Sequence, residues 1–107
     1  FFGIKDIPHH GVYYPGTVTS VLERSYSETI QKEPRLSEES IGAWFHTGHV
    51  DYYSPKRIIS SMVDVVSKNC IFLLNIPPKA DGSFDEEAVK LLKEIGGWMQ
   101  VNGDAIY

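Results

Sequence analysis

Cysteine is nearly absent from this chain. Cys70 is the single cysteine in 107 residues, so an internal disulfide is excluded. It lies within an apolar run, where we expect it to be a small buried residue rather than a reactive one.

Long apolar runs and an excess of positive charge are also missing. No run reaches the roughly 18 apolar residues of a membrane-spanning helix, and Phe1-Phe2-Gly3 does not start a signal peptide. The chain has ten Lys and Arg and fourteen Asp and Glu, which gives a net charge of −4. Nucleic-acid binding depends on basic patches. The sequence therefore predicts neither a nucleic-acid nor a membrane partner.

The clearest pattern present is a helix that begins at Pro55. The Ser54 hydroxyl can cap free backbone amides, and proline at the first helical position has a suitable φ and needs no hydrogen-bond partner for its nitrogen. Lys68-Asn69 provides a cation and a helix-ending residue, so we expect the helix to end about Asn69. Its apolar residues recur near the helical period. They are Ile58, Ile59, Met62, Val63, Val65 and Val66.

A strand and a second helix are predicted to follow. Residues 70–74, CIFLL, show no alternation, as in a parallel strand covered on both faces, and Pro77-Pro78 ends the strand. Asp81-Gly82 indicates a turn. A helix is then expected from about Asp85, capped either by Ser83 with Glu86 or by Asp85 itself. The residues of its predicted buried face are Ala88, Leu91, Leu92, Ile95 and Met99. Asn102-Gly103 is the predicted left-handed C-cap.

The first half of the chain has weaker patterns. We expect a loop at 11–16, a strand at 17–22, a loop with a helical turn at 23–36 and a second strand at 39–45. The resulting order predicts an α/β fold with parallel strands and flanking helices, the C-terminal βα units of a partial (β/α)8 TIM-like barrel. A complete barrel needs about 200 or more residues. Residues 1–107 are therefore expected to be part of a longer barrel or to pair with a partner.

The end of the chain carries a family resemblance. The stretch VDVVSKNCIFLLNIPPKADG, followed by WMQVNGDAIY, resembles the end of the catalytic barrel of the α-L-fucosidases, glycoside hydrolase family 29. The resemblance implies that 1–107 is a C-terminal fragment of a retaining enzyme that hydrolyses α-linked L-fucose from glycans. It further implies a fucosylated glycan or fucoside and the remaining N-terminal part of the barrel as partners, no metal or organic cofactor, and a secreted, periplasmic or lysosomal location.

The resemblance also suggests a general acid/base. Glu23 ends a predicted strand, and barrel enzymes build their sites where strands end. The family's acid/base glutamate lies in a similar segment about a dozen residues before a proline-tryptophan or similar pair, and Glu23 precedes Pro34 by eleven. We assign this role to Glu23. In the alternative interpretation, Glu23 has no catalytic role and its carboxylate pairs with Arg24 or contacts solvent. Four other carboxylates compete with it, namely Glu28, Glu33, Glu38 and Glu39.

Substrate-binding residues are expected in SIGAWFH and at the end of the last strand. The segment resembles one whose aromatic side chain lines the fucose pocket, so Trp44 is the candidate, with Phe45 and His46 beside it. Core packing is the alternative for Trp44. The Asn75 amide is expected either to bond substrate or a catalytic neighbour, or to support the tight loop before Pro77.

Several features set limits on this interpretation. The spacing of His46 and His49 lacks the further ligands that zinc requires, so we expect no metal site. The family's W-F-D-G-like segment with its nucleophilic aspartate is absent, so the isolated chain is expected to be inactive. Arg35 and Cys70 replace residues typical of the family. They favour the alternative of a non-catalytic, degenerate sugar-binding or scaffold domain. A small independent α/β domain is a third hypothesis.

Overall fold

The computed structural model describes residues 3–5, 19–23, 26–32 and 34–107, with the backbone alone for the first two ranges. The predicted loop at 11–16 and the start of the predicted strand at 17–22 lie outside them. The chain divides into two compact units. The first comprises Phe1–Glu39 and Asp64–Leu73, and the second comprises Ser40–Val63 and Leu74–Tyr107.

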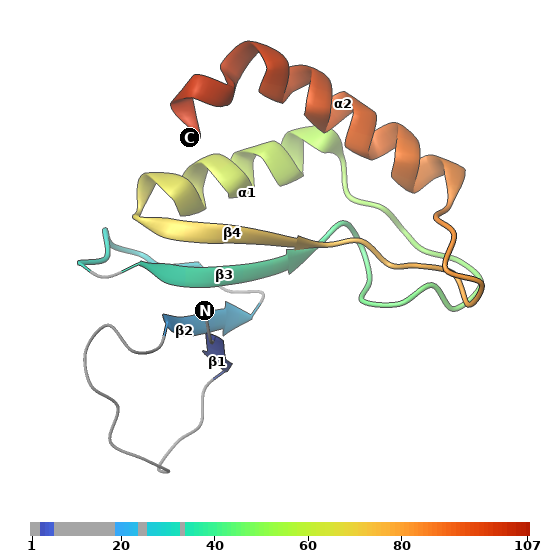
Figure 1. Cartoon of the computed structure of the whole chain (residues 1–107), viewed down its shortest axis with the longest axis horizontal. Helices are drawn as coiled ribbons and strands as arrows, with labels where there is room; N and C mark the ends of the chain where they lie inside the picture. Colours follow the sequence, from blue (N-terminus) through green and yellow to red (C-terminus); the bar gives the residue numbers. More distant parts are fainter. Residues whose placement is uncertain (1–2, 6–18, 24–25, 33) are drawn as a thin grey trace. The chain divides into compact units, whose positions relative to one another are not determined.

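Four strands form one sheet, most of whose residues belong to the first unit (Figure 1). Its strands follow the chain in the order β1 (Gly3–Lys5), β2 (Thr19–Glu23), β3 (Arg35–Ser40) and β4 (Cys70–Asn75). The β1–β2 and β2–β3 pairs are parallel. The prediction of parallel strands is therefore confirmed for these pairs, whereas β1 was not expected from the sequence.

The position of β3 corrects the predicted strand at 39–45, because it begins at Arg35 and ends at Ser40. Polar side chains occupy its buried positions: Ser37 is 1% and Glu39 6% exposed. The strand therefore lacks the apolar pattern by which strands are recognised. Past Ile41 the chain bends, and Gly42 approaches the Asp51 backbone so closely that a Cβ would lie 2.6 Å from the Asp51 carbonyl oxygen.

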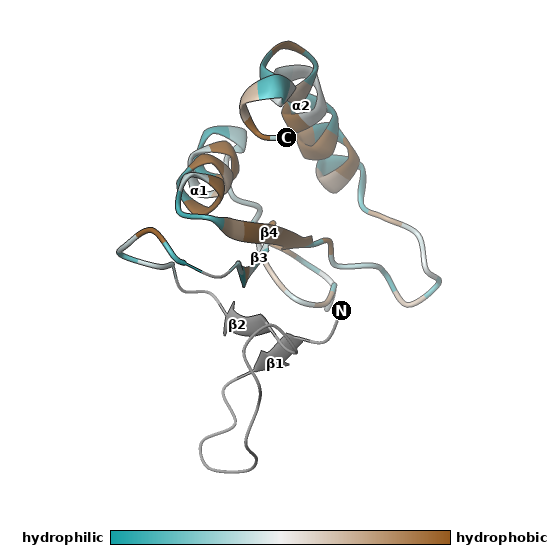
Figure 2. Cartoon of the chain, turned by 60° about the vertical axis from the view of Figure 1, so that its left-hand side comes forward, coloured by the Kyte–Doolittle hydropathy of each residue, from teal (hydrophilic) through white to brown (hydrophobic). Residues whose placement is uncertain are grey.

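The strand β4 is confirmed, with one difference in burial. It is apolar along most of its length (Figure 2), and Cys70 is buried as expected. Its exposure nevertheless alternates, because Ile71 and Leu73 on one face are 40% and 39% exposed. The expectation of cover on both faces is thus wrong for these residues of the chain.

The helix α1 (Pro55–Ser67) begins at the predicted residue and ends two residues before the expected end at Asn69. The Arg57 backbone N–H donates to the Ser54 hydroxyl oxygen at 3.2 Å, which is an N-cap bond. At the other end Asn69 has a φ of 59°, and its side chain donates to the Gln31 carbonyl at 3.0 Å. Asn69 takes the left-handed conformation, and Cys70 begins the strand β4 directly after it.

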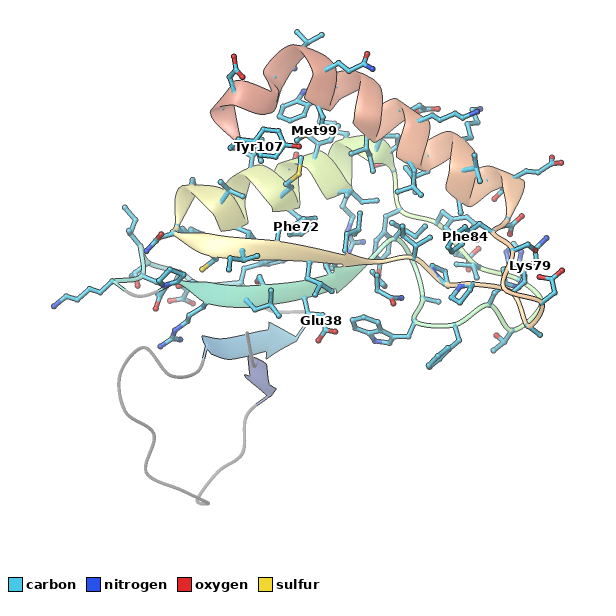
Figure 3. All side chains as sticks on the ribbon, in the orientation of Figure 1. Glu38, Phe72, Lys79, Phe84, Met99 and Tyr107 are labelled. Atoms are coloured by element: carbon cyan, nitrogen blue, oxygen red, sulfur yellow. The ribbon has the colours of Figure 1, made fainter. Side chains whose placement is uncertain are left out.

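The helix α2 (Glu86–Asn102) buries three residues of the predicted face, Ala88, Leu91 and Ile95. The other two, Leu92 and Met99, are half-buried. Its predicted left-handed C-cap is wrong. Gly103 has a φ of −57° and continues into a 3-10 helix, Gly103–Ala105. A Cβ on Gly103 would lie 3.3 Å from the Tyr107 ring, which lies beside the end of α2 in Figure 3.

Candidate functional site

The predicted sugar-binding residues lie in the second unit, with Trp44, Phe45 and His46 on the bend that follows β3 and Asn75 at the end of β4. We call Ala43, Trp44, Phe45 and His46 the aromatic segment. Trp44 is half-buried, whereas Phe45 is 73% exposed. A half-buried indole next to an exposed phenyl ring gives the segment apolar surface that still meets solvent.

Asn75, at the end of β4, fixes the backbone of the aromatic segment. Its Nδ2 donates to the Ala43 carbonyl at 3.3 Å and to the Trp44 carbonyl at 3.1 Å. In addition, the Ile41 N–H donates to the Asn75 carbonyl at 3.1 Å. Of the two roles expected for Asn75, the structure shows a loop-supporting one, although the loop is that before His46 and not that before Pro77.

His46 is held at both ring nitrogens. Its Nε2 lies 3.0 Å from Oδ2 of Asp85, and its Nδ1 accepts the Gly48 backbone N–H at 3.3 Å. A ring whose Nδ1 accepts must carry its proton on Nε2 when neutral, which suits donation to the carboxylate. The side chain is 11% exposed. His46 is therefore oriented from two sides.

Asp85 and Tyr52 complete this cluster, and sequence analysis assigned a site role to neither. Asp85 occupies the N-cap position of α2 but makes no side-chain cap hydrogen bond, although such a bond is worth about 1 kcal/mol. Its Oδ2 instead accepts from His46 and, at 3.2 Å, from the Tyr52 hydroxyl. Ser83 does not form the expected capping box. Its hydroxyl donates to Asp81 at 2.6 Å.

The hydrogen bonds of this cluster shift two pKa values. The bond from His46 is the main cause that lowers the pKa of Asp85, opposed by burial. Burial, followed by the bond to Asp85, raises the pKa of Tyr52 to about 12. A neutral tyrosine beside an ionised carboxylate is thus the favoured state near neutral pH.

We expect Tyr52 to ionise near pH 12 instead of near 10, because burial and the hydrogen bond to Asp85 both oppose loss of its proton. The folded state then binds more protons than the unfolded state between about pH 10 and 12, so stability falls as pH rises through that window. Ultraviolet titration at 295 nm of the wild type and of Tyr52→Phe measures the ionisation of Tyr52 as the difference between the two curves. A Tyr52 signal at the ordinary pKa contradicts the Asp85 contact.

The proposed acid/base residue is described only through its backbone. Glu23 is the last residue of β2, as predicted, and its Cα pairs in register with that of Glu38. Among the competing carboxylates, Glu39 is buried and accepts the Tyr26 hydroxyl at 2.5 Å. Glu38 is half-buried, Glu28 is exposed and Glu33 lies outside the described residues. The catalytic role of Glu23 remains a prediction.

His49 does not join His46. Its Nε2 lies 3.0 Å from Oδ1 of Asp51, and both side chains are largely exposed. Within the described part of the chain, no three His, Cys, Asp or Glu side chains gather in a way that could hold a metal ion. In the same part, no helix has the length and apolar character needed to cross a membrane.

Several α-L-fucosidases have solved structures similar to this chain. α-L-Fucosidase isoenzyme 1 from Paenibacillus thiaminolyticus matches 83% of this chain and 23% of its own with a TM-score of 0.77 and 30% identity. The Thermotoga maritima α-fucosidase in complex with fucose matches 96% of this chain and 22% of its own, with a TM-score of 0.73 and 26% identity. The fold thus has counterparts among the α-L-fucosidases, a class of glycoside hydrolases.

Sequence comparison agrees with the structural comparison. The family model for alpha-L-fucosidase matches residues 3–104. The alpha-L-fucosidase of Branchiostoma floridae is 30% identical over 104 residues, covering 92% of this chain. The chain belongs to the alpha-L-fucosidase family. It spans 22% of the Branchiostoma floridae relative and 13% of the human plasma alpha-L-fucosidase.

Proposed function

We propose that this chain is the C-terminal part of the catalytic (β/α)8 barrel of a retaining α-L-fucosidase, and that the parent protein hydrolyses α-linked L-fucose from glycans. The observation that carries the proposal is the family match across residues 3–104. It extends over the aromatic segment, the end of β4 and the start of α2, so the whole described site lies inside the matched region.

The exposed face of β4 supports a larger barrel. Ile71 and Leu73 leave apolar surface uncovered on one face of an otherwise apolar strand. Parallel sheets normally have both faces covered. The remaining strands of a barrel would cover this face with their inward-pointing side chains.

For the chemistry we assign Glu23 as general acid/base. As the acid it would protonate the glycosidic oxygen while a second carboxylate attacks the anomeric carbon, so the glycosidic bond breaks and a fucosyl-enzyme ester forms. As the base it would then take a proton from the water that hydrolyses this ester. The second carboxylate would come from a part of the parent outside these 107 residues.

For substrate binding we assign Trp44, Phe45, His46 and Asn75. The apolar face of a sugar packs against flat aromatic rings, which Trp44 and Phe45 supply. Asn75 supports them by holding the two carbonyls of the aromatic segment. His46 contributes through its ring orientation, which two hydrogen bonds fix.

The full-length parent tests this function. It is expected to hydrolyse an aryl α-L-fucoside and to release fucose first as the α anomer, because two displacements at the anomeric carbon retain configuration. Proton NMR of the early product measures this. Fucose binding without turnover would select the sugar-binding or scaffold alternative. If the parent neither binds nor hydrolyses fucosides, both hypotheses are rejected. Release of the β anomer would reject the retaining mechanism.

A further inference from the structure

We propose that Asp85 is the positioning residue of the site, and that it acts through His46 to hold the aromatic segment in its sugar-binding conformation. The proposal deepens the proposed function and rests on it. Asp85 does not touch substrate in this scheme. It decides where Trp44 and Phe45 lie.

The first step of the argument is the unusual use of the Asp85 carboxylate. The residue has the backbone conformation of an N-cap, with φ −62° and ψ 145°, yet its side chain makes no cap bond. Instead the carboxylate reaches a residue 39 positions away in sequence. The start of α2 thus loses a local stabilising bond, while a long-range contact to the aromatic segment is gained.

The second step is that this contact fixes one end of the aromatic segment while Asn75 fixes the other. His46 is bound at Nε2 by Asp85 and at Nδ1 by Gly48, whose φ of 102° shapes the turn. Asn75 binds the carbonyls of Ala43 and Trp44. A segment held at both ends does not have to be ordered when ligand binds, so its binding surface is preorganised.

The third step separates positioning from stability. Serine is as good an N-cap as aspartate, but its side chain is too short to replace the carboxylate at His46. Asp85→Ser in the full-length protein should therefore keep the thermal midpoint while releasing His46. Asp85→Asn keeps an oxygen that can accept from Nε2, so it serves as the conservative variant.

We expect Asp85→Ser to raise KM for an aryl α-L-fucoside about tenfold, because the aromatic segment is no longer held through His46. The value of kcat should stay within about threefold of wild type. Asp85→Asn should keep KM within about threefold. The matched control is Asp64→Asn, which removes a carboxylate paired with Lys68 at 2.8 Å in the first unit. It should leave KM unchanged.

A spectroscopic readout makes the test independent of activity. In protein labelled with ¹⁵N-histidine, wild-type His46 should show a protonated Nε2 and an unprotonated Nδ1, and Asp85→Ser should lose this pattern. An unchanged pattern, or a wild-type KM in Asp85→Ser, overturns the proposal. If the wild-type protein does not act on fucosides, the proposed function fails by itself, and the His46 spectra still decide whether Asp85 holds the ring.

Discussion

Replacing Glu23 by Gln in the full-length protein is expected to lower kcat/KM by about 10²- to 10⁴-fold for fucosides with poor leaving groups. A substrate with a good leaving group should lose far less at the bond-breaking step. The reason is that a poor leaving group needs protonation of its oxygen in the transition state, whereas a good one departs as an anion. Kinetics on a series of aryl fucosides measures the difference.

Glu38→Gln is the appropriate control for this experiment. Its Cα is the register partner of Glu23 on the neighbouring strand, so it introduces the same chemical change at an adjacent backbone position. We expect Glu38→Gln to show no dependence on the leaving group. Equal losses on all substrates for Glu23→Gln would remove that residue from the acid/base role, and a leaving-group dependence in Glu38→Gln would transfer the role to Glu38.

Gly42→Ala is expected to lower the free energy of unfolding by about 1–3 kcal/mol, the usual cost of overpacking a filled site. The added Cβ would lie 2.6 Å from the Asp51 carbonyl oxygen and 3.0 Å from a Val50 methyl group. Backbone atoms cannot rotate away as a long side chain can, so the bend before the aromatic segment must shift. Thermal denaturation of the full-length protein, together with fucose titration, measures both effects.

Two glycines in α2 provide the opposite control. Gly96 and Gly97 lie inside the helix, and a Cβ on either would meet no atom within 4 Å. Alanine there should stabilise the helix by up to about 1 kcal/mol, because glycine is the less favourable helical residue. A Gly42→Ala protein as stable as Gly96→Ala would show that the bend tolerates a side chain.

The sequence predicted α1, β4 and α2 well because each carries a strong local pattern. Ser54-Pro55 gives α1 its start, and the Arg57 N–H does bond the Ser54 hydroxyl. The prediction failed for β3, whose buried positions are occupied by Ser37 and Glu39. Residues elsewhere in the chain form hydrogen bonds with such polar groups, as the Tyr26 hydroxyl does with Glu39. A hydrophobicity pattern does not reveal these partners.

The candidate site shows the same division. Trp44, Phe45, His46 and Asn75 could be selected from a resemblance to a family, and the structure brings all four into one unit. Asp85 was considered only as a helix cap. Its bond to His46 joins residues 39 positions apart, and no local spacing rule predicts a pair at that separation. Tyr52, which shares the same carboxylate oxygen, was missed for the same reason.

Sequence alone therefore determined the two helices and the last strand, because caps, turns and apolar periodicity act between residues a few positions apart. The family was indicated by the motifs in residues 63–82 and 98–107. Tertiary structure alone decided which partners the Asp85 carboxylate takes. Asp85 could bond its own helix or the distant His46, and the choice depends on how the chain brings the start of α2 to the aromatic segment. The free energy of a long-range hydrogen bond depends on the distance and orientation of its two groups in the folded chain, and a local sequence pattern does not specify these.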